Sequence, residues 1–314
     1  GLIGSFLTDV IWFYNKNHIH TIEVTLTSRN CTKLEKRFPY LMKDDKFHFV
    51  ERNVENSIDS GEEYDYIINA ASNADPGVYA RYPVETIKTN VIGTINTLEY
   101  TRSHKNTKVL FTSTMEVYGG KIHSETFKEN QYGLIDFNEI RSSYPESKRI
   151  AELLMRSYAE EYNSNVVIAR LGYIYGPTMT STDNKVVAQF INNVLKNEDI
   201  VLKSRGEQRR SYCYVADAVL GILTVLFHGE SGEAYNVANP YSIITIAQLA
   251  EKTAELNEKT VKFECPDELE KKGFSKPQDA VLNTEKLQKL GFEPRYSIED
   301  GLKQTVAILA DVRR

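Results

Sequence analysis

Tyr144 and Lys148 form the pattern with the clearest chemical use in this sequence, because four positions separate them. On a helix this spacing places both side chains on one face, one turn apart. An ammonium group beside a phenol favours the phenolate, which predicts a Tyr144 pKa below its usual value of about 10 and a usable general base. The chain has 19 tyrosines, so about one such pair is expected by chance and the pattern alone is weak.

The residues after this pair support a helix. Apolar and aromatic side chains recur there at helical spacing, namely Ile150, Leu153, Leu154, Tyr158 and Tyr162. We therefore expect the tyrosine and the lysine to open an amphipathic helix.

A second chemically useful pattern opens the chain at Gly1-Leu2-Ile3-Gly4 and continues into an apolar helical run. Glycines at a helix start let the backbone approach a pyrophosphate, although they suit a plain N-terminal turn equally well. A dinucleotide-binding turn of the form Gly-x-x-Gly-x-x-Gly would have one more glycine and a strand ahead of it. We therefore expect the true N-terminus, with a first strand, to be missing from this sequence.

Strand and helix patterns alternate along the first half of the chain. Strands are expected at Ile22–Leu26, Phe47–Val50, Tyr64–Ile68 and Val109–Phe111, and a helix at Val84–Tyr100. This alternation predicts an α/β fold with a parallel, doubly wound sheet. Ligands bind such sheets at the carboxyl ends of the strands. Three segments fall there: Ser28-Arg29-Asn30, Ala70-Ala71 and Thr112–Gly119.

Composition narrows the class of partner. The 314 residues suffice for one large domain or two closely joined ones, and the net charge of −5 includes no basic run, which argues against nucleic acid and acidic membranes as partners. The three cysteines are too few and too scattered for a disulfide framework or a metal cluster, which favours a reducing cytoplasm. No stretch approaches the roughly 20 apolar residues that span a bilayer.

Three segments occur in a telling order: Ser113-Thr-Met-Glu-Val-Tyr-Gly119, then Tyr144-x-x-x-Lys148, then Arg170-x-x-x-x-Tyr175-Gly-Pro177. This order resembles the extended short-chain dehydrogenase/reductases, and within them the nucleotide-sugar epimerases, dehydratases and decarboxylases. The resemblance runs nearly end to end, through Asn90–Thr94, Gly206–Asp217, Tyr235–Asn239 and Leu290–Pro294. UDP-glucuronate decarboxylases look most similar, through Arg141–Tyr144 and Lys185–Val187.

The resemblance implies a Rossmann-type dinucleotide-binding domain over residues 1–170. Residues 171–314 would form mainly a smaller α/β domain that binds the nucleotide sugar, with some segments returning to the Rossmann sheet. It also implies a homodimer that pairs through the two long helices after Pro83 and after Tyr144.

The resemblance assigns catalytic roles to four residues. Tyr144 would take the proton of the C4 hydroxyl of a hexose while hydride leaves C4, and Lys148 would hold the phenolate and bind the nicotinamide ribose. Thr114 would share the hydroxyl hydrogen bond and steady the developing alkoxide. Glu116 is a carboxylate that a simple C4 epimerase does not need. Dehydratases and decarboxylases carry it there, because a 4-keto sugar has acidified protons at C3 and C5.

Four positions depart from the family pattern. Met115 stands where glucose-type 4,6-dehydratases have aspartate and decarboxylases have serine, and a thioether cannot donate a proton. Tyr173 replaces a common substrate-contacting asparagine, and Asn53 replaces an aspartate near the adenine. Arg29 ends the second strand where an acid would bind the ribose diol, which hints at NADP, although an arginine that stacks on adenine is comparably plausible.

The resemblance yields two sets of binding residues and no metal site. The cofactor set is Gly1, Leu2, Ile3, Gly4, Arg29, Asn53, Ala70, Ala71, Asn90, Thr112, Tyr144 and Lys148. The substrate set is Met115, Tyr173, Lys185, Val186, Arg210 and Lys276. In the second set Arg210 is the preferred phosphate ligand, because a guanidinium binds a diphosphate in a bidentate manner.

Three hypotheses on function remain. The first is an NAD-dependent nucleotide-sugar epimerase/dehydratase that oxidises C4 transiently and returns the hydride, with NADP as an alternative cofactor. The second keeps this oxidation but uses Glu116 for cleavage, as an NDP-uronate decarboxylase or a 4,6-dehydratase does. The third is a cofactor-binding protein with little turnover that acts in regulation or assembly.

Overall fold

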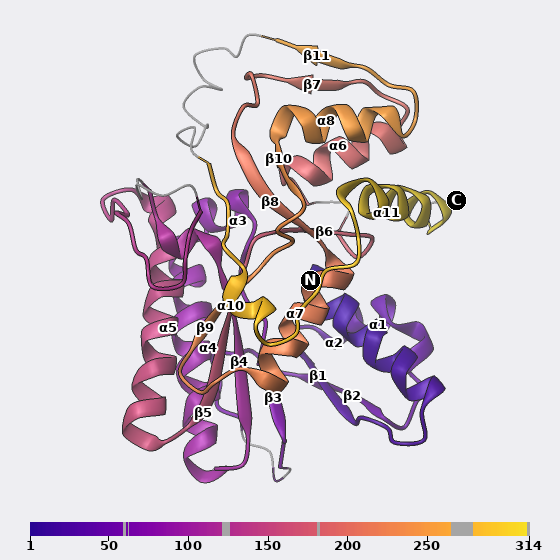
Figure 1. Cartoon of the computed structure of the whole chain (residues 1–314). Coiled ribbons are helices and arrows are strands. Elements are labelled where there is room, and N and C mark those ends of the chain that lie inside the picture. Colours follow the sequence, from indigo (N-terminus) through magenta and orange to yellow (C-terminus); the bar gives the residue numbers. More distant parts are fainter. Residues whose placement is uncertain (59–60, 62, 121–125, 181–182, 265–278, 313–314) are drawn as a thin grey trace.

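The computed structural model describes residues 1–58, 61, 63–120, 126–180, 183–264 and 279–312 (Figure 1). Its centre is a four-stranded parallel sheet with the order β3-β4-β5-β9. The strands are β3 (Tyr66–Asn69), β4 (Lys108–Thr114), β5 (Asn165–Leu171) and β9 (Ala234–Val237). A separate parallel pair, β1 (Val24–Ser28) and β2 (Phe47–Glu51), lies beside it. The parallel, doubly wound α/β architecture expected from the sequence is confirmed.

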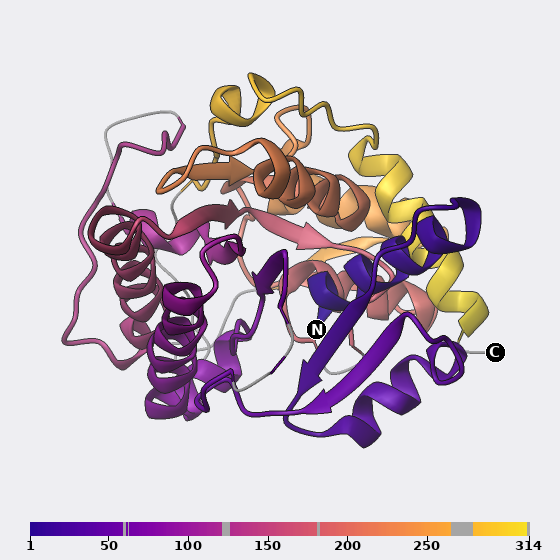
Figure 2. The ribbon, with the colours of Figure 1, turned by 90° about the horizontal axis from the view of Figure 1, so that it is seen from below.

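Helices cover both faces of the central sheet. On one face lie α4 (Pro83–Ser103) and α5 (Ser143–Tyr162), side by side in both views (Figures 1 and 2). On the other face lies α7 (Val215–His228), against which α1 (Leu2–Asn17) packs. Successive side chains of a strand point to opposite faces, and strands covered on both faces therefore need continuous apolar runs. Val109 and Phe111 accordingly pack with residues of α4 and α5, whereas Leu110 packs with residues of α7.

The pair β1–β2 shares no hydrogen-bonded ladder with β3 among the described residues. In a doubly wound sheet of order 3-2-1-4-5-6, strand 1 separates strand 2 from strand 4. The expectation of a strand ahead of Gly1 stays a prediction.

The remaining elements of the first half are short. They are α2 (Cys31–Arg37), α3 (Pro76–Arg81) and the 3-10 turns η1 (Pro39–Leu41), η2 (Met115–Tyr118) and η3 (Ile140–Ser142). The turn η2 follows β4 directly, and η3 leads into α5, so both lie next to residues expected to do chemistry. No helix in the described ranges is long and apolar enough to cross a membrane.

The C-terminal part forms a second core above the sheet (Figure 1). Its three-stranded sheet has the order β10-β8-β6, from β6 (Tyr173–Tyr175), β8 (Arg209–Tyr214) and β10 (Ile243–Thr245). A two-stranded sheet joins β7 (Ile200–Leu202) to β11 (Val261–Phe263). The helices are α6 (Val186–Leu195), α8 (Ile246–Glu255), α10 (Glu285–Gln288) and α11 (Ile298–Val312). The strand β6 follows β5 after Gly172 alone, so this core lies directly above the carboxyl end of the central sheet.

Candidate active site

Tyr144 and Lys148 lie in the first turns of α5, as their spacing predicted. Both are buried, with exposed fractions of 5% and 1%. The Lys148 ammonium donates to the carbonyl of Thr112 at 2.7 Å and lies 4.4 Å from the centre of the Phe111 ring. The helix therefore presents the pair to β4, at the carboxyl end of the sheet.

Thr114 is the last residue of β4 and connects the strand to the tyrosine. Its Oγ1 accepts a hydrogen bond from the backbone N–H of Glu116 at 3.2 Å and so caps the turn η2. The same side chain is hydrogen-bonded to Tyr144, which lowers the pKa of the phenol. Thr114 therefore both caps the turn η2 and forms a hydrogen bond with the expected general base, Tyr144.

The pKa of Tyr144 differs from the expectation. Burial of the phenol, followed by the charge of Glu116, raises its pKa above the usual value, and the Thr114 hydrogen bond opposes this only in part. Burial also lowers the pKa of Lys148 to about 7. The prediction of a lowered Tyr144 pKa is therefore wrong, because removal of the phenol from water outweighs the Thr114 hydrogen bond, which alone lowers the pKa.

A buried ion pair holds α5 against the sheet. Arg170 of β5 and Glu152 of α5 approach to 2.6 Å, and both side chains are nearly inaccessible. Ser113 of β4 donates to the same carboxylate at 2.5 Å, and Arg170 also donates to the Tyr118 hydroxyl at 3.0 Å. Removing one partner of such a pair strands a buried charge, so this network fixes the helix that carries the tyrosine at the end of β4.

Glu116 faces Arg141, which the sequence analysis named only as part of the resemblance to UDP-glucuronate decarboxylases. The Arg141 guanidinium lies 3.7 Å from the Glu116 carboxylate and donates to the Tyr79 hydroxyl at 3.4 Å. The Tyr79 ring stacks on the Tyr144 ring, with centroids 4.9 Å apart and planes within 5°. The partial burial of Glu116 raises the pKa of its carboxyl, and Arg141 opposes this rise. A carboxyl whose pKa is raised by burial therefore lies beside the tyrosine.

Tyr173 and Arg210 complete this group from the second core. The Arg210 guanidinium lies 5.3 Å from the centre of the Tyr173 ring, and the arginine is 8% exposed. Burial raises the pKa of Tyr173, and the charges of Arg210 and Glu116 act on it in opposite directions. Arg209, the preceding residue and the first of β8, points away and pairs with Asp279 at 2.8 Å. Because successive side chains of β8 point to opposite faces, only Arg210 of these two arginines points into the site.

The other expected substrate residues lie at the edge of this group. Met115 is buried with apolar residues of the loop after η2 and of the C-terminal part, and Tyr173 packs against that cluster. Lys185 occupies the N-cap position of α6 without a side-chain cap, and its ammonium lies 3.5 Å from the Asp183 carboxylate. Val186, the first residue of α6, is exposed. Lys276 lies outside the described residues.

Comparison with known proteins identifies this arrangement. A model of the NAD dependent epimerase/dehydratase family matches residues 1–238. The chain belongs to this family. UDP-glucuronic acid decarboxylase 6 of Arabidopsis thaliana is 33% identical over 307 residues, which cover 96% of this chain and 84% of that protein. UDP-glucuronic acid decarboxylase 1 of Xenopus tropicalis is 31% identical over 310 residues, which cover 98% and 69%.

Solved structures of nucleotide-sugar enzymes share the fold. The UDP-glucose 4-epimerase of Thermotoga maritima, solved with UDP-glucose, has a TM-score of 0.84 at 24% identity over 99% of this chain and 96% of that one. The dTDP-glucose 4,6-dehydratase of Bacillus anthracis, solved with NAD, has a TM-score of 0.80 at 22% identity over 97% and 93%. The family match and the decarboxylase relatives make the chain an NAD-dependent enzyme of the family, and the hypothesis of a cofactor-binding protein with little turnover is set aside.

The residues around Lys148 fit the nicotinamide ribose of this cofactor. A lysine ammonium has three donors, and in the described part of the chain the Thr112 carbonyl is its one hydrogen-bond acceptor. The buried ammonium can therefore donate to a ribose diol. At the end expected to bind the pyrophosphate, α1 begins at Leu2 after Gly1 with no side-chain cap, and a Cβ built on Gly1 or Gly4 would meet no atom within 4 Å. Free first-turn N–H groups with open space beside them suit a pyrophosphate.

Three members of the expected cofactor set are engaged within the protein. Asn90 is buried, accepts from Ser72 at 2.8 Å and donates to Ser147 at 2.9 Å, so its amide joins α4 to α5 and to the loop after β3. Asn53 accepts from the N–H of Glu55 in a local turn. Arg29 forms an ion pair with Glu85 of α4. Ala70 and Ala71 follow β3 directly and remain accessible at the carboxyl end of the sheet.

Sequence reasoning missed two residues of this region, Tyr79 and Glu85. Tyr79 lies in α3, which the chain opens with an Asp75 cap and a proline. Those two residues are a local signal for a helix start, but no local pattern relates Tyr79 to Tyr144, which lies far along the chain. Among the described residues, no group of His, Cys, Asp and Glu is arranged to hold a metal ion.

Proposed function

We propose that this protein oxidises C4 of a nucleoside-diphosphate uronate and releases its carboxyl group as CO2. The observation that carries the proposal is the Glu116–Arg141 pair beside the stacked rings of Tyr79 and Tyr144. A plain C4 epimerase moves no proton at C5, so it has no use for an acid at this place. The named relatives among UDP-glucuronic acid decarboxylases support the same reaction class.

The residues divide the proposed reaction as follows. Tyr144 takes the proton of the C4 hydroxyl, and Thr114 stabilises the oxygen as charge develops on it. Bound NAD supplies a reversible acceptor for the hydride of C4. The ketone at C4 lies β to the C6 carboxylate, so the C5–C6 bond can break, with its electron pair passing to an enolate on the C4 oxygen. Protonated Glu116 then gives its proton to C5, and return of the hydride to C4 leaves a nucleoside-diphosphate pentose.

The cationic groups of the site suit the charges of such a substrate. Arg210 is buried, and a guanidinium away from bulk water binds an anionic group strongly when the geometry is bidentate. Arg141 lies where it can contact both Glu116 and a carboxylate at C5. We assign Arg210 to the diphosphate, Arg141 to the sugar carboxylate, and the start of α6 at Lys185 and Val186 to the nucleobase.

Met115 favours a second candidate function, epimerisation without cleavage. Its side chain is buried in an apolar cluster, and a thioether donates no hydrogen bond to a leaving or rotating group. With Glu116 as a base at C5 or as a bystander, the same oxidation would end in inversion of configuration. Product analysis separates this outcome from decarboxylation.

The decisive measurement is mass spectrometry of products from a panel of UDP-, GDP-, CDP- and dTDP-linked hexoses and hexuronates. We expect a uronate to lose the mass of one CO2, with no net consumption of NAD because the hydride returns within each cycle. The matched neutral hexose should undergo no cleavage. A product of unchanged mass from every uronate would contradict decarboxylation and favour epimerisation.

We further propose a homodimer that pairs through α4 and α5, and a cytoplasmic location. The outward faces of the two helices expose Val84 and Leu153 at 64% each, Ile150 at 46% and Ile87 at 41%. Exposed apolar side chains gathered on two adjacent helices are typical of an interface, and a two-fold axis lets one patch cover its own copy. We propose the cytoplasm because the three cysteines are few and scattered, which suits a reducing compartment.

Substitution of Leu153 by aspartate tests the dimer. The wild type should have twice the monomer mass in light scattering at micromolar concentration, and the variant should shift toward the monomer because a charge would be buried in the interface. Ile308→Asp is the control, since Ile308 is 40% exposed on α11, on the opposite side of the molecule (Figure 2). A monomeric wild type would refute the proposal.

A further inference from the structure

An ion pair joins two elements at the edge of the cofactor site. Arg29 is the first residue after β1, and Glu85 lies in the first turn of α4, 56 positions later. The guanidinium Nη1 donates directly to the Glu85 carboxylate. Their side chains are 60% and 41% exposed, so the pair is open to solvent and to a ligand. In doubly wound sheets the carboxyl end of this strand binds the adenosine ribose.

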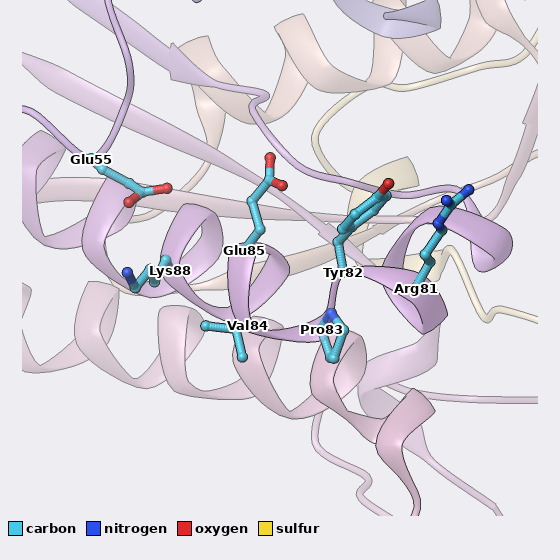
Figure 3. A pocket seen from close by; sticks show the side chains of 7 residues that line it. All are labelled: Glu55, Arg81, Tyr82, Pro83, Val84, Glu85 and Lys88. Carbon is cyan, nitrogen blue, oxygen red and sulfur yellow. The ribbon is translucent and has the colours of Figure 1, made fainter.

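The loop after β2 is anchored on α4, the helix that carries Glu85. Asn96 donates to the Val54 carbonyl at 2.9 Å, and Gly93 lies so close to Val54 that a Cβ would be 3.0 Å from its side chain. A cavity of about 460 Å³ opens between this loop and the start of α4. It is lined by Glu55, Arg81, Tyr82, Pro83, Val84, Glu85 and Lys88 (Figure 3). Glu85 thus borders an open space between the loop after β2 and the start of α4.

The charge of Arg29 taken alone would favour NADP. A strand-end acid accepts hydrogen bonds from the ribose diol of NAD, whereas an arginine there accommodates the 2′-phosphate of NADP. In this protein the arginine is already bound to a carboxylate, and that carboxylate would repel a phosphate close to it. The ion pair therefore places a carboxylate, that of Glu85 in α4, at the end of β1.

We propose that Glu85 makes this enzyme select NAD over NADP. Its carboxylate compensates the charge of Arg29, excludes the 2′-phosphate and accepts a hydrogen bond from the ribose. Arg29 in turn orients Glu85. The inference goes beyond the proposed function, because it concerns the cofactor and holds for any sugar substrate.

A competition experiment tests it by binding alone. Protein is incubated with a large excess of an equimolar mixture of NAD+ and NADP+, desalted and denatured, and the released dinucleotides are quantified by mass spectrometry. The wild type should retain mainly NAD+. In Glu85→Gln the ratio of NAD+ to NADP+ should fall by about tenfold or more, because Arg29 is then free to bind phosphate. The shift should shrink at high salt, since the groups are exposed.

Two further variants make the result specific. Arg29→Ala introduced into Glu85→Gln should remove the gain in NADP+ binding. Glu99→Gln is the matched control, because Glu99 forms an exposed pair with Arg102 at 3.1 Å near the far end of α4. It should leave the ratio unchanged. A Glu85→Gln protein that melts near the wild-type temperature and keeps a ratio within twofold of the wild type would overturn the proposal, whatever the outcome of the substrate panel.

Discussion

Replacement of Tyr144 by phenylalanine should abolish turnover with every nucleotide sugar. In the proposed reaction the phenol takes the C4 hydroxyl proton, and the structure holds it between a hydrogen bond with Thr114 and the stacked ring of Tyr79. Loss of a general base costs about 100- to 10,000-fold in rate. The variant should still bind NAD, because Lys148 and the start of α1 are unchanged. Single-turnover absorbance of reduced nicotinamide should show no oxidation of substrate.

The pH dependence of the turnover rate also tests whether Tyr144 is the general base. Burial raises the pKa of Tyr144, so the phenol is protonated at neutral pH unless positive charge lies near it. Because the base acts in its deprotonated form, the wild-type rate should rise as pH increases along the acid limb, and the residual rate of the variant should not. Tyr162→Phe, at the other end of α5, is the control and should keep the wild-type rate and profile. Wild-type turnover by Tyr144→Phe would assign the base to another residue.

The elements that position this tyrosine could be predicted from sequence because their signals are local. The apolar run at Val109–Phe111 predicted a buried strand, since a parallel strand covered on both faces needs apolar residues at successive positions. The helical spacing after Lys148 predicted α5, and Ile150 and Leu153 on its outer face remain exposed. The strand-end position of Thr114 followed from these two assignments.

The contacts within the site could not be predicted in this way, because they join residues that are far apart in the chain. Tyr79 meets Tyr144 only because α3 packs against α5, and Arg29 meets Glu85 only because β1 ends beside α4. The pKa of Tyr144 fails as a sequence prediction for a related reason. The spacing shows neither how completely the fold removes the phenol from water nor that the charge of Glu116 acts on it.

Substitution of Glu116 by glutamine should separate cleavage from simple epimerisation. If Glu116 transfers the proton at C5, its loss should slow turnover by about two to four orders of magnitude. Oxidation at C4 uses Tyr144 and should survive, so reduced nicotinamide would accumulate together with a stalled 4-keto sugar. A rapid-mixing absorbance trace followed by mass analysis of the quenched reaction measures both.

The Glu116→Gln variant should also differ from the wild type in the incorporation of solvent deuterium at C5. In heavy water the wild type should place deuterium at C5 of the product, because the proton of Glu116 exchanges with solvent, and the variant should place it there far more slowly. Glu146→Gln is the matched control, since Glu146 pairs with Arg149 at 3.5 Å on α5 and has a similarly accessible side chain. Near-normal turnover of Glu116→Gln would identify a plain C4 epimerase. A variant that fails to bind substrate would make Glu116 a binding residue. Arg141 would then position Glu116 to contact the sugar, and Glu116 would transfer no proton.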